Sequence, residues 1–191
     1  MMRLLVVFVA VLATAALAQD RPTMRQLPGT GTLPQPPSQR DLVDARAELK
    51  ARFREPLSHT ETAAGARLAA ETLLAAAVDE PDRSLKWLML DEARRLGAAA
   101  GSADTVTRAI TLSSAIYDFD ELDLEFRSLA EIPLRALDPM RATRLAEAAE
   151  KLAARADTDG RTDMAAAAQL LAVKAWQRSG NTAAARRLLG Q

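Results

Sequence analysis

The residues able to do acid–base or nucleophilic chemistry are few in this chain of 191 residues. It has one histidine, His59, and no cysteine, which excludes disulfides, thiolate metal sites and a cysteine nucleophile. His59 stands between Ser58 and Thr60, but adjacent residues on a helix do not face each other. A nucleophile motif of the form Gly-x-Ser-x-Gly is also missing from the sequence. We therefore interpret His59 as a surface histidine, predict no catalytic residue and expect no enzymatic activity.

The acidic turn that begins at Asp157 has part of the spacing of a calcium-binding loop. If Gly160 takes the place of the invariant glycine, Asp157 and Asp159 fall at the third and fifth ligand positions. The first position is then Arg155, and Ala166 stands where a bidentate glutamate belongs. The segment therefore predicts a polar turn, and we expect neither a bound metal nor a cofactor in this chain.

The densest acidic patch spans residues 118–125. Asp120, Glu121 and Asp123 fall at the start of a predicted helix, where free amides and the helix dipole favour negative charge. This position explains the acids without a ligand, and a weak divalent-cation site or a contact with a basic partner is the alternative. A pair of carboxylates for glycoside hydrolysis is a tertiary arrangement that sequence spacing does not reveal.

Three side chains are our candidates for partner binding: Trp87, Arg94 and Trp176. Tryptophan and arginine are the residues that most often anchor protein interfaces. Packing of Trp87 against a neighbouring helix pair and a solvated arginine face are the alternatives. Because 25 basic residues balance 25 acidic ones, nucleic acid is not an expected partner. We expect a protein or peptide partner, and a homo-oligomer is an open alternative.

Helices must position these residues, because no stretch after residue 40 shows the alternating pattern of a strand. The first helix is predicted at about 40–54, capped by Ser38 and ended by Glu55-Pro56. A capping box at Ser58–Glu61 predicts the second at about 59–78. The side chains of this helix that are predicted to face inward are Leu68, Thr72, Ala75 and Ala76.

The later helices begin at recognisable caps. The third is predicted at about 82–100 and ends at Gly101; Ser102, Asp120 and Asp138 each precede a further helix, and Gly180-Asn181 separates the last two. Starts that recur roughly every 18–23 residues give a two-helix unit in the range of helical-hairpin repeats. We predict an all-α fold of about eight helices, with antiparallel pairs stacked as a right-handed superhelix; a compact helical bundle is the alternative.

The N-terminal region reads as an export signal followed by a linker. Residues 1–18 have one basic residue, an apolar run and small residues that end in Ala16-Leu-Ala18, which is the pattern of a cleavable signal peptide. Residues 19–39 contain five of the nine prolines and predict a disordered, polyproline-like leader before the helical domain of residues 40–191. We expect cleavage after Ala18, a location in the periplasm or outside the cell, and no membrane insertion of the mature chain.

Two segments carry a family resemblance. Residues 176–189 resemble a tetratricopeptide repeat: Trp176 stands at an aromatic position, Gly180-Asn181 at the turn, Ala185 at the small position and Leu189 at the large one. Residues 88–120 resemble a helical module of exported planctomycete proteins. The resemblance implies a scaffold that binds protein segments on a concave face.

We therefore expect an exported, non-enzymatic scaffold for protein–protein contacts in the cell envelope. Two alternatives belong to other functional classes. One is a helical hydrolase that acts on envelope polysaccharide through a lone carboxylate, and the other is a self-assembling structural protein.

Overall fold

The computed structural model describes residues 32–190 of the chain. The predicted signal peptide and the predicted leader up to residue 31 lie outside the described residues. Within the described part, the chain forms helices and no strand, so the predicted all-α class is confirmed. The helices are α1 (Leu42–Arg52), α2 (Arg54–Leu57), α3 (Ala63–Asp79), α4 (Arg83–Ala99), α5 (Ala103–Ser114), α6 (Glu121–Ala130), the 3₁₀ turn η1 (Leu134–Ala136), α7 (Pro139–Thr158), α8 (Thr162–Ser179) and α9 (Thr182–Leu189).

Most of the predicted helix ends are confirmed. Ser102, Asp120 and Asp138 are N-caps, and each side chain accepts a hydrogen bond from the amide three residues further on. Gly101 and Gly180 follow helices with φ of 72° and 84°, a left-handed conformation that favours glycine. These local signals therefore place the starts of α5, α6 and α7 and the ends of α4 and α8.

The connection before α3 differs from the prediction. Pro56 does not end a helix but lies inside the short α2, where a first-turn proline leaves no amide unpaired. Thr62, rather than Ser58, caps α3, because its Oγ1 accepts the amide of Gly65 at 3.0 Å. The Ser58 hydroxyl instead donates to the carbonyl of Glu55 at 2.8 Å.

The predicted inward face of α3 is also wrong. Leu68 is 69% exposed and Ala75 is exposed, whereas Thr72 and Ala76 are only half-buried. The helix is rich in alanine and leucine on all sides, so its sequence does not define which stripe faces the core. The buried stripe consists of Ala66, Ala69, Ala70, Leu73, Leu74 and Ala77.

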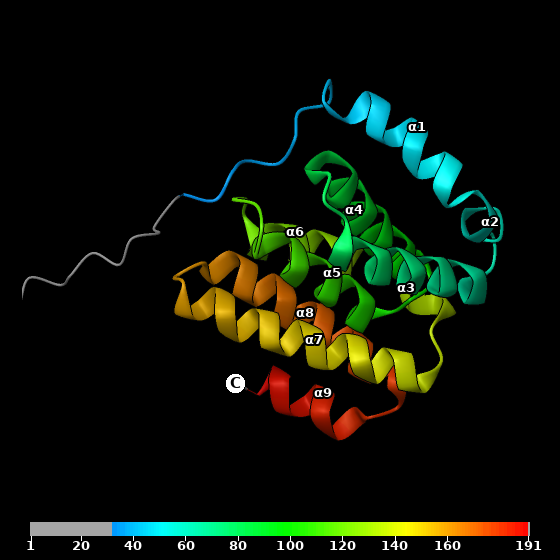
Figure 1. Ribbon diagram of the computed structural model, residues 1–191. Coiled ribbons are helices and arrows are strands. Elements are labelled where there is room, and N and C mark those ends of the chain that lie inside the picture. Colours follow the sequence, from blue (N-terminus) through cyan, green and yellow to red (C-terminus); the bar gives the residue numbers. More distant parts are fainter. Residues whose placement is uncertain (1–31, 191) are drawn as a thin grey trace, which may run out of the picture. The chain divides into compact units, whose positions relative to one another are not determined.

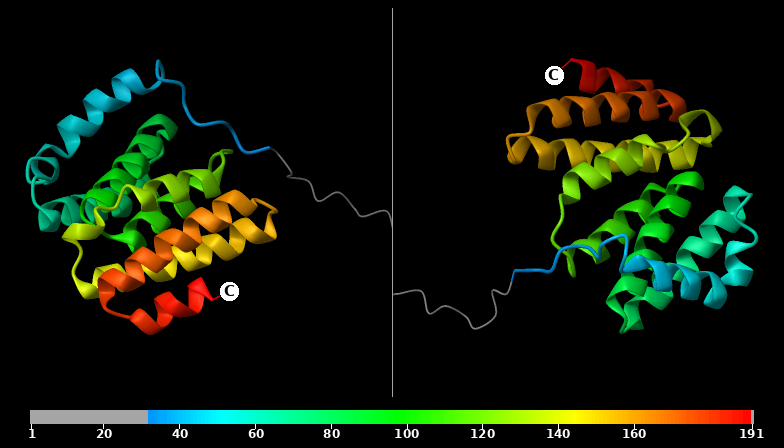
Figure 2. Two further views of the ribbon diagram at one scale, coloured as in Figure 1. Left: turned by 180° about the vertical axis from the view of Figure 1, so that it is seen from behind. Right: turned by 90° about the horizontal axis from the view of Figure 1, so that it is seen from above.

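The helices from α3 to α9 pack in chain order (Figure 1). Each contacts the next, and contacts also link α3 to α5 and α5 to α7 in one row, and α4 to α6 and α6 to α8 in another. The α1 helix packs on α4, at the other end of the molecule from α9 (Figures 1 and 2). None of the helices in the described region is both long enough and apolar enough to cross a bilayer.

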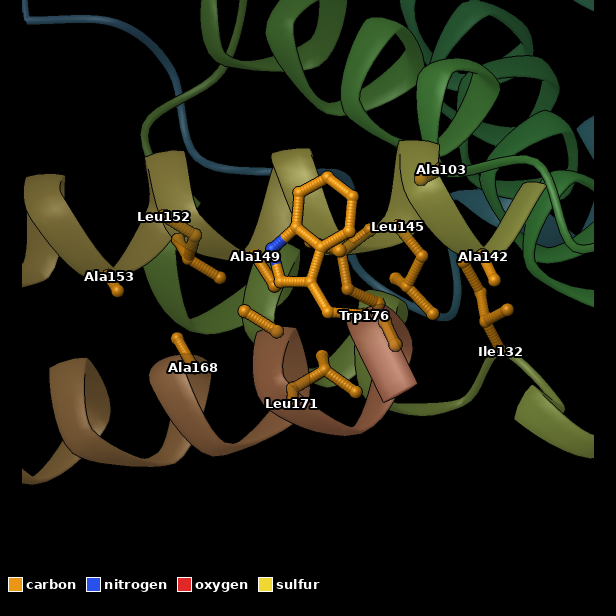
Figure 3. Packing of buried hydrophobic residues seen from close by; sticks show 14 of the residues in the cluster. Ala103, Ile132, Ala142, Leu145, Ala149, Leu152, Ala153, Ala168, Leu171 and Trp176 are labelled. Carbon is orange, nitrogen blue, oxygen red and sulfur yellow. The ribbon is translucent and has the colours of Figure 1, made fainter. Parts of the chain in front are cut away.

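Two hydrophobic clusters form the core. One lies mainly on α1, α3 and α4, and the other mainly on α5 to α9. In the second, Trp176 of α8 lies among Leu145, Ala149 and Leu171 between α7 and α8 (Figure 3). Small alanine side chains on both helices allow this close packing, as the high alanine content suggests.

The last residues of the predicted leader are packed. The carbonyl of Pro34 accepts the amide of Asp118 at 2.9 Å, and Pro34, Pro36 and Pro37 are half-buried. Residues 34–37 of the predicted disordered leader are therefore held against the helical domain.

Candidate functional site

One face of α7 lines a groove along the helix. Three hollows of about 500, 370 and 320 Å³ follow one another there. Arg155 borders the first and second, whereas Asp104 and Arg144 border the second and third. We call this continuous surface the α7 groove. Its α7 residues are Met140, Arg141, Arg144, Glu147, Ala148, Lys151, Ala154, Arg155 and Thr158.

Other helices form the opposite wall. The spacing of three or four positions along α7 places its lining residues on one helix face. Opposite them, α5 contributes Asp104, Thr107 and Arg108, the start of α6 contributes Asp120 to Leu122, and α3 contributes Arg67. The row α3, α5 and α7 therefore supplies most of the groove.

A buried carboxylate, Glu125 of α6, is fixed at the middle of the groove. Glu125 is 3% exposed; it accepts Arg155 Nη1 at 2.6 Å on one oxygen and the Thr107 hydroxyl at 3.1 Å on the other. Arg155 also donates to Glu121 at 2.5 Å. Since both oxygens of Glu125 are engaged, this carboxylate orients Arg155 rather than presenting a free acid to a substrate.

Charge coupling keeps Arg155 ionised. Partial burial lowers the pKa of this guanidinium, but hydrogen bonds and the charges of Glu121 and Glu125 outweigh it, so the pKa of Arg155 is raised. The result is a fixed cation whose Nη atoms point at α6.

A second ion pair closes the α6 end of the groove. Arg161 Nη1 lies 2.8 Å from each carboxylate oxygen of Asp120. The pKa of Asp120 is lowered, first by the hydrogen bond from the Asp123 amide and then by Arg161. Asp120 thus both caps α6 and pairs with Arg161, the residue that directly precedes α8.

Two cations in the groove remain free of acidic partners among the described residues. Lys151 lines the second hollow and Arg67 the third, both side chains are exposed, and no acid of residues 32–190 lies within ion-pair distance of either. The remaining groove cations each face an acid: Arg108, Arg141, Arg144, Arg155 and Arg161. A ligand therefore meets uncompensated positive charge at Lys151 and Arg67.

None of the three partner-binding candidates from the sequence lines the groove. Trp176 is 8% exposed, and its indole N–H donates to Glu150, so it acts inside the fold (Figure 3). The Arg94 side chain is 13% exposed and donates to Asp91 and Ser128, each at 2.8 Å. Trp87 is half-buried and packs edge-on against Tyr117, with ring centroids 5.1 Å apart.

The features that suggested metal or acid–base chemistry stay apart from one another. His59 is exposed between α2 and α3. Asp157 lies within α7, and Gly160, with φ of 74°, ends that helix. In residues 32–190, no three His, Asp or Glu side chains come together in a way that could hold a metal ion.

Sequence reasoning missed the α7 groove because its walls come from helices distant in the chain. The only signal was the polar stripe on α7 at every third or fourth residue, which is also typical of a solvated helix face. In comparisons with protein-family models, curated proteins and solved structures, nothing matches this chain.

Proposed function

We propose that this protein is a non-enzymatic helical scaffold that binds an extended protein segment in the α7 groove. The proposal rests on one observation: a single helix face lines three hollows that share residues. From residue 140 to residue 158 the helix rises about 27 Å, at 1.5 Å per residue. An extended segment of about eight residues has the same length.

The helix order supports a tetratricopeptide-like arrangement. The contacts within the row α3, α5 and α7 and within the row α4, α6 and α8 fit a stack of helix pairs. Proteins built from stacked helical repeats bind their ligands on extended concave surfaces. In this proposal, the row α3, α5 and α7 is the binding row, since it contributes most of the groove residues.

The free cations indicate the chemistry of the segment. Lys151 and Arg67 line neighbouring hollows, and no acid in the described residues pairs with them. A segment with carboxylates in register with these two positions would neutralise them, and such complementarity fixes orientation and raises association rates. We therefore propose an acidic peptide segment as the ligand.

Selection of peptides tests this function. A displayed library of random ten-residue peptides is panned on the protein and then on the Arg67→Glu/Lys151→Glu variant. We expect the peptides that bind the wild type to be enriched in Asp and Glu and to lose binding to the variant. Lys174→Glu, on the exposed side of α8 outside the groove-lining set, is the control for one charge reversal, and Arg67→Glu and Lys151→Glu are each compared with it as single variants. No enrichment, or equal loss with Lys174→Glu, would contradict the proposal.

We also propose that the protein is exported. The support is the sequence of residues 1–18, with its apolar run and the Ala16-Leu-Ala18 end. When the chain is expressed in a bacterium with a periplasm, we expect to recover it from the periplasm or the medium. Its mass should be that of a chain that starts at Gln19. A cytoplasmic protein with an intact N-terminus would contradict this.

A further inference from the structure

A proline-rich strap crosses the loop between α5 and α6. The strap is residues 34–37, Pro-Gln-Pro-Pro, and it reaches this loop in an extended conformation (Figure 1). It brackets one residue of the loop: the Asp118 amide donates to the carbonyl of Pro34 at 2.9 Å, and Gln35 Nε2 donates to Asp118 Oδ2 at 3.0 Å. The backbone and the side chain of Asp118 thus form hydrogen bonds with two consecutive strap residues.

The strap has the chemistry of a polyproline ligand. Pro34 and Pro37 have the Pro-x-x-Pro spacing, and the three prolines are half-buried while Gln35 is exposed. Proline fixes φ, so the segment loses little conformational entropy when it binds, and its carbonyls are free to accept hydrogen bonds. Domains that bind such segments use grooves lined with aromatic side chains.

The loop that the strap crosses has an aromatic side chain on each side of Asp118. Tyr117 and Phe119 flank Asp118, and both pack edge-on against Trp87, with centroid distances of 5.1 and 5.7 Å. The Tyr117 hydroxyl donates to the Arg83 carbonyl at 2.5 Å, which fixes the ring. Tyr117 is 2% exposed with the strap in place, whereas Trp87 and Phe119 are half-buried, so the accessible part of this rigid cluster is Trp87 and Phe119.

The strap adds little to the core. It contributes no residue to the two buried clusters, and Leu33 beside it is 44% exposed. Its specific contacts are two hydrogen bonds to one residue. A contact of this kind is weak by itself, but the covalent link to α1 gives the strap an effective concentration in the millimolar range.

We propose that Trp87, Tyr117, Phe119 and Asp118 form a recognition site for proline-rich segments, and that residues 34–37 occupy it as an exchangeable intramolecular ligand. A Pro-x-x-Pro segment of another protein is the partner that displaces the strap. Phe119 also borders the first hollow of the α7 groove, but the site does not use Lys151 or Arg67, so the inference does not rest on the proposed function.

A peptide in trans tests the site. The probe is a fluorescent peptide with the sequence of residues 32–39, and the protein is the full chain with Pro34→Ser, Pro36→Ser and Pro37→Ser, which weakens the strap. We expect saturable binding by fluorescence anisotropy to this variant. We expect binding on the order of 100-fold weaker to the wild type, because the tethered strap competes. The same peptide with serine in place of its prolines is the matched control.

Two results would overturn the proposal. One is that the peptide binds the folded strap variant no better than its serine control does. The other comes from hydrogen exchange on the wild type, which decides the question even if the strap variant fails to fold. An exchangeable strap predicts that the Asp118 amide exchanges at least tenfold faster than the core amides of α7. If the Asp118 amide exchanges only with global unfolding, the strap is a permanent part of the fold and the proposal is wrong.

Discussion

Several charged side chains in this protein pair with residues from distant parts of the chain. Glu125 is buried on α6, and Arg155 on α7 is the cation that compensates it. The pair lies at the middle of the α7 groove and links its two walls, α6 and α7. Removal of one partner from a buried pair leaves an uncompensated charge, which costs more than the pair contributes.

Arg155→Met is expected to destabilise the protein by about 1–3 kcal/mol, because the buried Glu125 then lacks its half-exposed cation. The double variant Arg155→Met/Glu125→Leu should recover most of this loss, since the buried charge is gone. Urea unfolding followed by circular dichroism measures both. Arg95→Met is the control: the side chain of its partner Glu92 is 27% exposed, whereas that of Glu125 is 4% exposed, so the loss should stay under about 1 kcal/mol. A double variant as unstable as the single one would show that burial of Glu125 is not the cause.

Asp120 has two roles that substitutions can separate. Asparagine keeps the N-cap but not the charge, so Asp120→Asn should lose only a few tenths of a kcal/mol from the exposed pair with Arg161. Asp120→Ala also loses the cap and should cost about 1 kcal/mol more. The free energy of unfolding, measured with urea at pH 7, should decrease from the wild type to Asp120→Asn and further to Asp120→Ala. The reverse order of the two variants would contradict the capping role.

The lowered pKa of Asp120 gives the same comparison a pH dependence. Its charge stabilises the fold fully above the unfolded-state pKa of about 3.9, and this contribution is lost as the pH falls through the lower folded-state pKa. The difference between wild type and Asp120→Asn should therefore be present at pH 7 and decline below about pH 4. The sequence identified Asp120 as a cap, because capping is local. It could not identify Arg161 as the partner, since that contact is made across 41 residues.

At the scale of elements, helix ends followed local rules while helix faces depended on packing. Gly101 and Ser102 were recognisable from residue type alone, and the structure places them as predicted. The buried face of α3 was not recognisable, because an alanine-rich helix has no single apolar stripe. The helices that pack against α3 determine which of its faces is buried. The Ser58 capping box failed for a related reason: Thr62, four residues later, offered a competing cap.

Gly97 marks a close approach between α4 and α5. A Cβ at this position would lie 2.9 Å from Thr105 Cγ2 and 3.3 Å from the amide nitrogen of Val106. Alanine in place of glycine usually stabilises a helix by about 1 kcal/mol. Here Gly97→Ala should instead destabilise the protein by about 1–3 kcal/mol through overpacking.

The rescue variant for this prediction is Thr105→Ser, which removes the methyl group that Cβ would meet first. It keeps the hydroxyl that donates to Glu71 at 3.0 Å. In a double-mutant cycle of urea unfolding, Gly97→Ala should cost less in the Thr105→Ser background than in the wild type. An unchanged cost would mean that the contact with Thr105 does not limit the approach of the two helices.

At the scale of the whole molecule, the two core clusters meet where α4 packs on α5. Ala98 of α4 belongs to the cluster of the later helices, and Ala109 of α5 belongs to the cluster of the earlier ones. The α7 groove is built mainly on the later cluster, whereas α1 belongs only to the earlier one. Stability should therefore differ between these parts of the fold.

The α1 helix should open before α7 and α8. It buries only Leu42, Ala45 and Leu49, and its packing is on α4 and the short α2. By contrast, α7 and α8 bury seven residues each. Hydrogen–deuterium exchange read by mass spectrometry should show the α1 amides exchanging through a local opening, with α7 and α8 protected until global unfolding.

An interface variant distinguishes local opening from general destabilisation. Leu49→Ala truncates one of the three side chains that α1 buries. The substitution should therefore raise the exchange rates of the α1 amides and leave those of α7 and α8 almost unchanged. Leu152→Ala, in the middle of the α7–α8 packing (Figure 3), should lower the protection of every helix, at a cost of about 2–5 kcal/mol. If Leu49→Ala instead accelerated exchange in α7 as much as in α1, the two clusters would unfold as one cooperative unit. The walls of the groove would then depend on the contact between α1 and α4.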